Sequence, residues 1–161
     1  MKVLIADEDP SLCFFLNEVV QTVGHEPIVA NDGLQALEKF EKEHPDVVFS
    51  NLTMADLDGI ELLSEVRSRN PETIFVVITG SGAEEMTARA LRHKANNYLV
   101  KPVRFEVLIS LLEKYADIVR GRRIQTVLHR MVRRRELVMQ IPNRLELVAE
   151  VSDYLLGLTE G

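Results

Sequence analysis

Short apolar segments alternate with longer amphipathic segments over the first 120 residues of the chain. The short segments are rich in β-branched side chains, which favours buried strands, whereas the longer segments repeat their apolar residues with a helical period. Glycine, asparagine and proline residues between the segments support these boundaries. We expect strands over residues 3–6, 27–30, 47–50, 74–78 and 97–100. We expect helices over residues 11–23, 34–43, 60–69 and 84–93, and a fifth helix that begins near residue 104.

This alternation predicts an α/β fold, in which a parallel sheet is covered by helices on both faces. Five successive strand and helix pairs within about 120 residues indicate a doubly wound, five-stranded sheet of the flavodoxin-like type. The ligand site of such a sheet lies beyond the carboxyl ends of its strands. We therefore expect the functional residues of this chain at that edge.

The ends of four expected strands carry polar residues. In chain order these residues are Asp7, Glu8 and Asp9, then Asn51, then Thr79-Gly80, and then Lys101-Pro102. Because the carboxyl ends of parallel strands meet at one edge of a sheet, we expect the four groups to converge. Carboxylate oxygens suit a hard divalent cation such as Mg²⁺. A lysine and a hydroxyl opposite the carboxylates would suit the oxygens of a phosphate.

Five separated motifs resemble, in order and spacing, those of the receiver domain of bacterial two-component response regulators. The motifs are Asp7-Glu8, Asn51, Thr79, Tyr98 and Lys101-Pro102. The resemblance covers about residues 1–120 and implies a phosphorylation-controlled signalling switch in a phosphorelay, not an enzyme. It also implies a sensor histidine kinase or a phosphotransfer protein as partner, because an aspartate of a receiver attacks a phosphohistidine and becomes an aspartyl phosphate.

The resemblance implies that Asp7 and Glu8 form the acidic pair that binds Mg²⁺. It further implies that Thr53 is a metal ligand through its backbone carbonyl, and that position 51 is both a metal ligand and the phosphoacceptor. An asparagine occupies that position, and an uncharged amide is a very poor nucleophile, so Asn51 is not expected to accept phosphate. Two origins of Asn51 remain open: a natural receiver without an acceptor, and an engineered Asp→Asn substitution, which the retention of the other motif residues favours.

The remaining motif residues would act in switching. The resemblance implies that Thr79 bonds the phosphoryl group and that Lys101 pairs with it. It implies that Tyr98 rotates inward when Thr79 is drawn to the phosphate. It also implies a cis peptide bond between Lys101 and Pro102, a form found in about 5–6% of such bonds in folded proteins.

Several other residues have local interpretations. Asp9 followed by Pro10 is typical of a helix N-terminus, so we interpret Asp9 as a cap. Cys13 is the single cysteine and lies in an apolar helical stretch, which favours a place in the core. Ala55 and Lys94 depart from the family pattern, which often has proline and glycine there. The resemblance therefore does not determine the shape of these two loops, although the chemistry of the site is unaffected.

After about residue 104 an apolar helical pattern continues through Gly121 to Val138, longer than the sheet can cover. Such a stripe between arginines is typical of a dimerising coiled coil or a signal-conducting helix, with Gly121 marking a change of phase. We therefore expect a receiver domain over residues 1–120 and a helical extension over residues 121–161 that forms a homodimer. Pro142 would break the helix, and residues 146–156 would form a last helix, which could begin an output domain.

Charge and hydropathy limit the alternatives. The net charge is −6, with 9 Lys/Arg against 17 Asp/Glu in residues 1–103 and 10 against 8 afterwards. No apolar run approaches the roughly 20 residues of a membrane span, and no signal peptide pattern opens the chain, so we expect a cytoplasmic protein. The arginine-rich tail lacks interleaved aromatic residues, which disfavours nucleic-acid binding.

Three alternative functions remain. A DNA-binding regulator would use the arginine-rich tail, and an output domain of the anti-sigma-factor kinase type is suggested by a weak similarity over residues 141–148. An aspartyl-phosphate phosphohydrolase would use Asp7 as nucleophile with Asp9 two residues later. The placement of Thr79 and Lys101 fits a receiver better than a phosphohydrolase.

Overall fold

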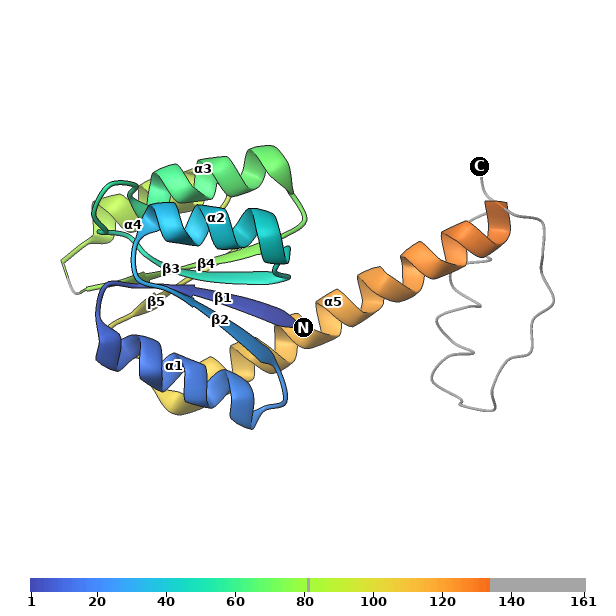
Figure 1. Cartoon of the computed structure of the whole chain (residues 1–161), viewed down its shortest axis with the longest axis horizontal. Helices are drawn as coiled ribbons and strands as arrows, with labels where there is room; N and C mark the ends of the chain where they lie inside the picture. Colours follow the sequence, from blue (N-terminus) through green and yellow to red (C-terminus); the bar gives the residue numbers. More distant parts are fainter. Residues whose placement is uncertain (81, 134–161) are drawn as a thin grey trace. The chain divides into compact units, whose positions relative to one another are not determined.

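The computed structural model describes residues 1–80 and 82–133, which contain a five-stranded sheet with helices on both faces (Figure 1). The strand order is β2-β1-β3-β4-β5, and all neighbouring strands are parallel, so the predicted flavodoxin-like fold is confirmed. The strands are β1 (Lys2–Ala6), β2 (Glu26–Ala30), β3 (Val47–Asn51), β4 (Ile74–Thr79) and β5 (Asn97–Val100). The helices are α1 (Pro10–Thr22), α2 (Gly33–Glu43), α3 (Gly59–Arg69), α4 (Glu84–Arg92) and α5 (Phe105–Arg133).

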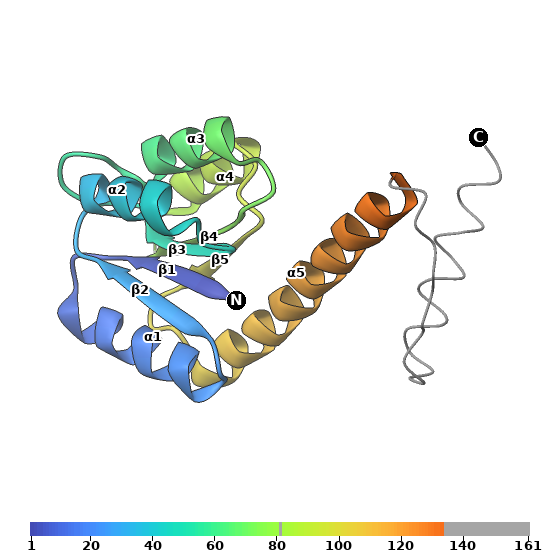
Figure 2. The same cartoon turned by 45° about the vertical axis from the view of Figure 1, so that its right-hand side comes forward.

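Helices cover both faces of the sheet (Figure 2). An apolar core lies on each face, because successive residues of a strand point to opposite sides. Val3 and Ile5 of β1 belong to the core that α1 and the first part of α5 complete. Leu4 and Ala6 belong to the core that α2, α3 and α4 complete. Apolar side chains therefore fill both faces of the sheet, and the polar residues fall at the carboxyl ends of the strands.

Local interactions position the helices that leave this edge. Asp9 is the N-cap of α1 with Pro10 at the first helical position, as predicted. Asp58 forms a capping box at the start of α3. A Cβ atom at Gly59 would collide with the backbone carbonyl of Asn51, so glycine is required where α3 begins this close to the end of β3.

Helix α5 is continuous through Gly121 as far as the structure describes it. Residues Met1–Arg122 make up one compact unit, and the predicted boundary at residue 120 stays a prediction. The predicted apolar pattern up to Val138, the break after it and the helix over residues 146–156 lie partly or wholly outside the described residues. Within the described part of the chain, no helix is both long and apolar enough to cross a membrane.

Candidate functional site

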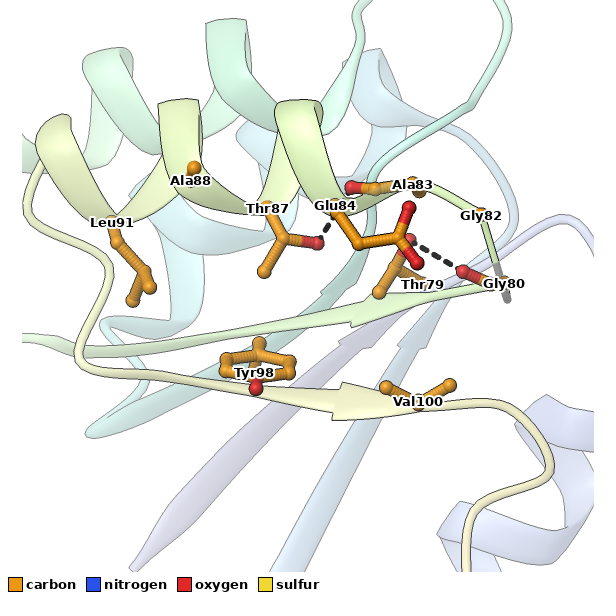
Figure 3. Close-up of a pocket in the computed structure, with 10 residues that line it drawn as sticks. All are labelled: Thr79, Gly80, Gly82, Ala83, Glu84, Thr87, Ala88, Leu91, Tyr98 and Val100. Carbon is orange, nitrogen blue, oxygen red and sulfur yellow. Dashed lines mark hydrogen bonds between the residues drawn. The ribbon is translucent and has the colours of Figure 1, made fainter.

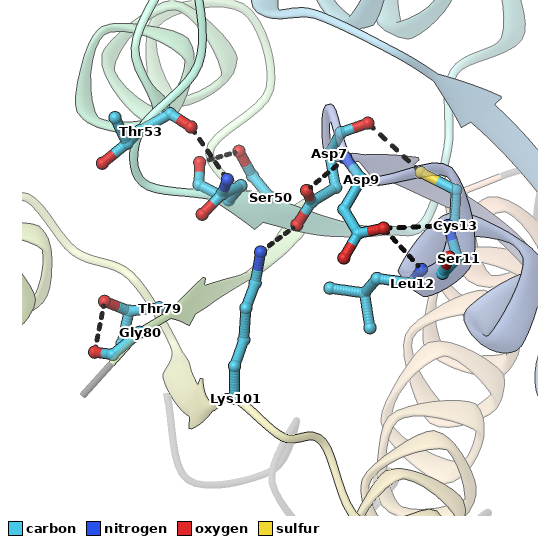
Figure 4. Close-up of polar contacts among 11 residues, drawn as sticks. Asp7, Asp9, Ser11, Leu12, Cys13, Ser50, Thr53, Thr79, Gly80 and Lys101 are labelled. Carbon is cyan, nitrogen blue, oxygen red and sulfur yellow. Dashed lines mark hydrogen bonds and ion pairs between the residues drawn. The ribbon is translucent and has the colours of Figure 1, made fainter.

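A buried ion pair joins the ends of β1 and β5. The Asp7 side chain is 1% exposed, and its Oδ2 lies 2.7 Å from the Nζ of Lys101. Its Oδ1 accepts a hydrogen bond of 2.9 Å from the backbone N–H of Asp9 (Figure 4). A carboxylate removed from water is stable only when it is paired and hydrogen-bonded, and both oxygens of Asp7 meet that requirement.

The two acidic residues after Asp7 turn to different partners. Asp9 accepts hydrogen bonds from the backbone N–H groups of Ser11 and Leu12, at 2.9 Å and 3.4 Å. Glu8 instead reaches across to the loop between β3 and α3, where its Oε1 accepts a hydrogen bond of 2.5 Å from the backbone N–H of Ala55. Glu8 therefore links the end of β1 to the β3–α3 loop, whereas Asp9 caps the N-terminus of α1.

Asn51 lies at the end of β3 and bonds to the loop that follows. Its Nδ2 donates a hydrogen bond of 2.8 Å to the backbone carbonyl oxygen of Thr53. A carbonyl oxygen can only accept, so the nitrogen of the amide is the atom that must face it. The hydroxyl of Ser50 also donates to the backbone carbonyl of Asn51, at 2.9 Å. The backbone carbonyl of Thr53, which the resemblance assigns to metal binding, is therefore already hydrogen-bonded within the chain.

Thr79 and Tyr98 line the same pocket but differ in exposure. Thr79 ends β4, is 3% exposed, and donates from its hydroxyl to the carbonyl of Gly80 at 3.3 Å. Tyr98 is 45% exposed and faces a pocket of about 440 Å³ between β5 and α4 (Figure 3). The structure therefore brings Asp7 and Lys101 into contact and Thr79 to the same edge, and it places Tyr98 on the outer surface.

The oxygen atoms near Asn51 suit Mg²⁺ in kind but carry little negative charge. In the part of the chain that the structure describes, no three His, Cys, Asp or Glu side chains come together as around a metal ion. The groups that could bind a metal ion are the carboxylates of Asp7 and Glu8, the Thr53 carbonyl and the amide oxygen of Asn51. All are oxygens, which suits a hard cation, but only two carry a charge and Lys101 already neutralises one of them.

Two backbone conformations concern residues that the sequence singles out. The bond between Lys101 and Pro102 is cis, as the resemblance implied. Lys94 adopts a left-handed backbone conformation with φ of 69°, in the turn after α4. Its carbonyl accepts hydrogen bonds from two nitrogens of the Arg67 side chain, at 3.0 Å and 2.8 Å, which holds the turn in place.

Cys13 lies in the core, as the sequence predicted, but its contact with the site was not predicted. The thiol is 4% exposed and donates a hydrogen bond of 3.2 Å to the backbone carbonyl of Asp7 (Figure 4). Burial, together with the nearby charge of Asp7, raises the pKa of the thiol, so Cys13 is a neutral packing residue at neutral pH. Its position in the first turn of the helix after Asp7 was the signal that could have revealed this contact.

The comparisons with known proteins agree with this architecture. The response regulator receiver domain family matches residues 3–113, and the chain therefore belongs to that family. The transcriptional regulatory protein ZraR of Escherichia coli K12 is 35% identical over 112 residues, which are 70% of this chain and 25% of ZraR. The chemotaxis protein CheY of Listeria monocytogenes is 27% identical over 117 residues, which are 72% of this chain and 98% of CheY.

Solved structures give the same result. The receiver domain of NtrX from Brucella abortus has a TM-score of 0.68 at 28% identity, covering 71% of this chain and 98% of that domain. The receiver domain of the Francisella response regulator 1452 has a TM-score of 0.65 at 30% identity, covering 73% of this chain and 98% of that domain. The chain spans about a quarter of the length of the ZraR proteins that it matches.

Proposed function

We propose that this receiver domain is a binding switch of a two-component phosphorelay in which Asn51 occupies the phosphoacceptor position and prevents phosphorylation. The observation that carries the proposal is the position of Asn51 at the same sheet edge as the Asp7–Lys101 ion pair and the Thr79 hydroxyl. The partner would be a sensor histidine kinase or a phosphotransfer protein in the cytoplasm. The domain would act by binding and not as an enzyme.

The chemistry of position 51 determines whether phosphate can be accepted. An aspartate there would attack the phosphorus of the donor through a carboxylate oxygen, and the bond between phosphorus and the leaving group would break. The nitrogen lone pair of an amide is delocalised into its carbonyl, and the Nδ2 of Asn51 is also bonded to Thr53. Lys101 and Thr79 would stabilise the phosphoryl group, but Asn51 supplies no nucleophile to receive it.

Magnesium would bind through the carboxylates of Asp7 and Glu8, the backbone carbonyl of Thr53 and the amide oxygen of Asn51. When bound, it would neutralise charge on phosphoryl oxygens. Asn51 brings one negative charge less than an aspartate would, and Lys101 competes for Asp7. We therefore expect weaker magnesium binding than in an Asn51→Asp variant.

The contacts of Asp9 argue against the phosphohydrolase alternative. That mechanism needs the second aspartate to act on the substrate, whereas both N–H groups bonded to Asp9 belong to the first turn of α1. In a receiver Asp9 would instead cap α1, which agrees with these contacts.

Intact-mass measurement after incubation with a small phosphodonor and Mg²⁺ tests the proposal. The chain as written should keep its mass, and the Asn51→Asp variant should gain one phosphoryl group, mapped by fragmentation to position 51. The Asn31→Asp variant is the matched control, because it makes the same chemical change at an exposed residue after β2. An unmodified Asn51→Asp protein, or labelling of the chain as written, would overturn the proposal.

A further inference from the structure

The loop between β3 and α3, residues 52–58, is held by hydrogen bonds from the chain itself. We infer that the side-chain amide of Asn51 takes the place of a bound cation in fixing this loop, so that its structure does not depend on Mg²⁺. This inference rests on the proposed metal site at Thr53, but it does not depend on phosphorylation.

Polar contacts hold the loop at three places. The Asn51 amide donates to the Thr53 carbonyl at 2.8 Å, and the Ala55 N–H donates to the Glu8 carboxylate at 2.5 Å. At the far end of the loop, the N–H of Gly59 donates to the carbonyl of Leu52 at 2.9 Å. The loop is therefore bonded near its start, in its middle and at its end.

Packing against the core also holds the β3–α3 loop in place. The side chains of Leu52 and Met54 are 1% and 8% exposed and belong to the core completed by α2, α3 and α4. Because these two residues flank Thr53, the position of its carbonyl is restricted from both sides. The Asn51 amide then meets a carbonyl that packing has already placed, and little further entropy is lost in forming the bond.

The oxygen atoms at this edge need positive charge or hydrogen-bond donors to hold them together. Glu8, Asp7 and the Thr53 carbonyl bring oxygen atoms to one edge, and a cation is one way to hold such atoms together. Here each has a donor from the chain: Ala55 N–H for Glu8, Lys101 for Asp7 and the Asn51 amide for Thr53. An aspartate at position 51 would turn a carboxylate oxygen toward the Thr53 carbonyl, and neither atom could donate.

Hydrogen exchange followed by mass spectrometry, with and without Mg²⁺, tests the inference on the whole chain. Exchange of residues 52–58 should be slow in the chain as written and unchanged by Mg²⁺. Without Mg²⁺ the Asn51→Asp variant should exchange there about tenfold faster or more, as expected from the loss of one hydrogen bond beside a new repulsion, and Mg²⁺ should reverse the increase.

Two further variants separate the effect of the lost hydrogen bond from the effect of the added charge. Asn51→Ala removes the donor without adding charge, so it should exchange faster both with and without Mg²⁺. Asn31→Asp, which adds the same charge at an exposed residue, should behave like the chain as written. The inference is overturned if Mg²⁺ slows exchange in the chain as written as much as in Asn51→Asp, or if Asn51→Ala leaves the loop protected. Phosphodonor labelling of Asn51→Asp is a separate readout, so either proposal can fail without the other.

Discussion

At the scale of single residues, the structure of the site depends on the donor with which each oxygen atom forms a hydrogen bond or ion pair. The spacing of the sequence predicted that Asp7 and Lys101 would share an edge, because both follow strands of a parallel sheet. It did not predict that Glu8 would bond to Ala55, or Asn51 to Thr53, because those contacts depend on the path of the β3–α3 loop. Loop paths are determined by tertiary packing, which hydrophobic periodicity does not report.

The Asp7–Lys101 pair gives a prediction at this scale. Replacing Lys101 with methionine would leave a carboxylate that is 1% exposed without its cation. We expect a loss of about 1–3 kcal/mol in the free energy of unfolding at neutral pH, because a buried charge would lose its compensation. Urea titration monitored by circular dichroism measures this loss.

Arg104 provides the control for that variant. Its nitrogen lies 4.0 Å from Glu106, and both side chains are about three-quarters exposed, so Arg104→Met should not change stability measurably. The double variant Asp7→Asn, Lys101→Met should recover part of the loss, since the uncompensated charge is gone. Equal stability of Lys101→Met and the chain as written would contradict the assigned role of the pair.

At the scale of elements, the sequence predicted all five strands and the first four helices to within about one residue at each end. Periodicity and capping residues were sufficient there because both are local signals. The close approach of α3 to the end of β3 was not predicted, since it depends on Gly59 packing against the backbone of Asn51 and Leu52. The turn at Lys94 likewise needs the Arg67 side chain, which comes from a different helix.

Two glycine substitutions test this difference between local and tertiary constraints. Gly59→Ala should lower the free energy of unfolding by about 1–3 kcal/mol, because its Cβ would collide with the backbone at the end of β3. Gly121→Ala lies inside α5 with no atom near its Cβ position, so it should be neutral or stabilising by up to about 1 kcal/mol. Thermal and urea unfolding of both variants checks the sign. Similar effects from the two would contradict the packing argument.

At the scale of the whole molecule, apolar cores fill both faces of the sheet, and the functional residues lie at the carboxyl ends of the strands. The core that contains α1 also contains residues of the first part of α5. The sequence predicted that the apolar pattern of α5 would be longer than the sheet can cover. Among the described residues, Ile118 and Val127 of α5 are exposed apolar side chains, in line with that pattern. Periodicity predicts such a stripe but does not identify what covers it, because that depends on a surface elsewhere.

A homodimer through α5 is the prediction that follows. Exposed apolar side chains along a helix are removed from water most simply by a second copy of the same helix. Light scattering should give a dimer for residues 1–161 and a monomer for a chain that ends at Gly121, just inside the compact unit Met1–Arg122. The same oligomeric state for both chains would refute dimerisation through the helix.

The most direct test of the account compares the stability of two chains, the protein as written and its Asn51→Asp variant, by urea titration with and without Mg²⁺. Without Mg²⁺ the protein as written should be the more stable by about 1–3 kcal/mol, because its amide donates to Thr53 and adds no charge beside Asp7 and Glu8. Added Mg²⁺ should stabilise the variant by mass action and leave the protein as written nearly unchanged. A variant that is clearly more stable without Mg²⁺ would contradict the account.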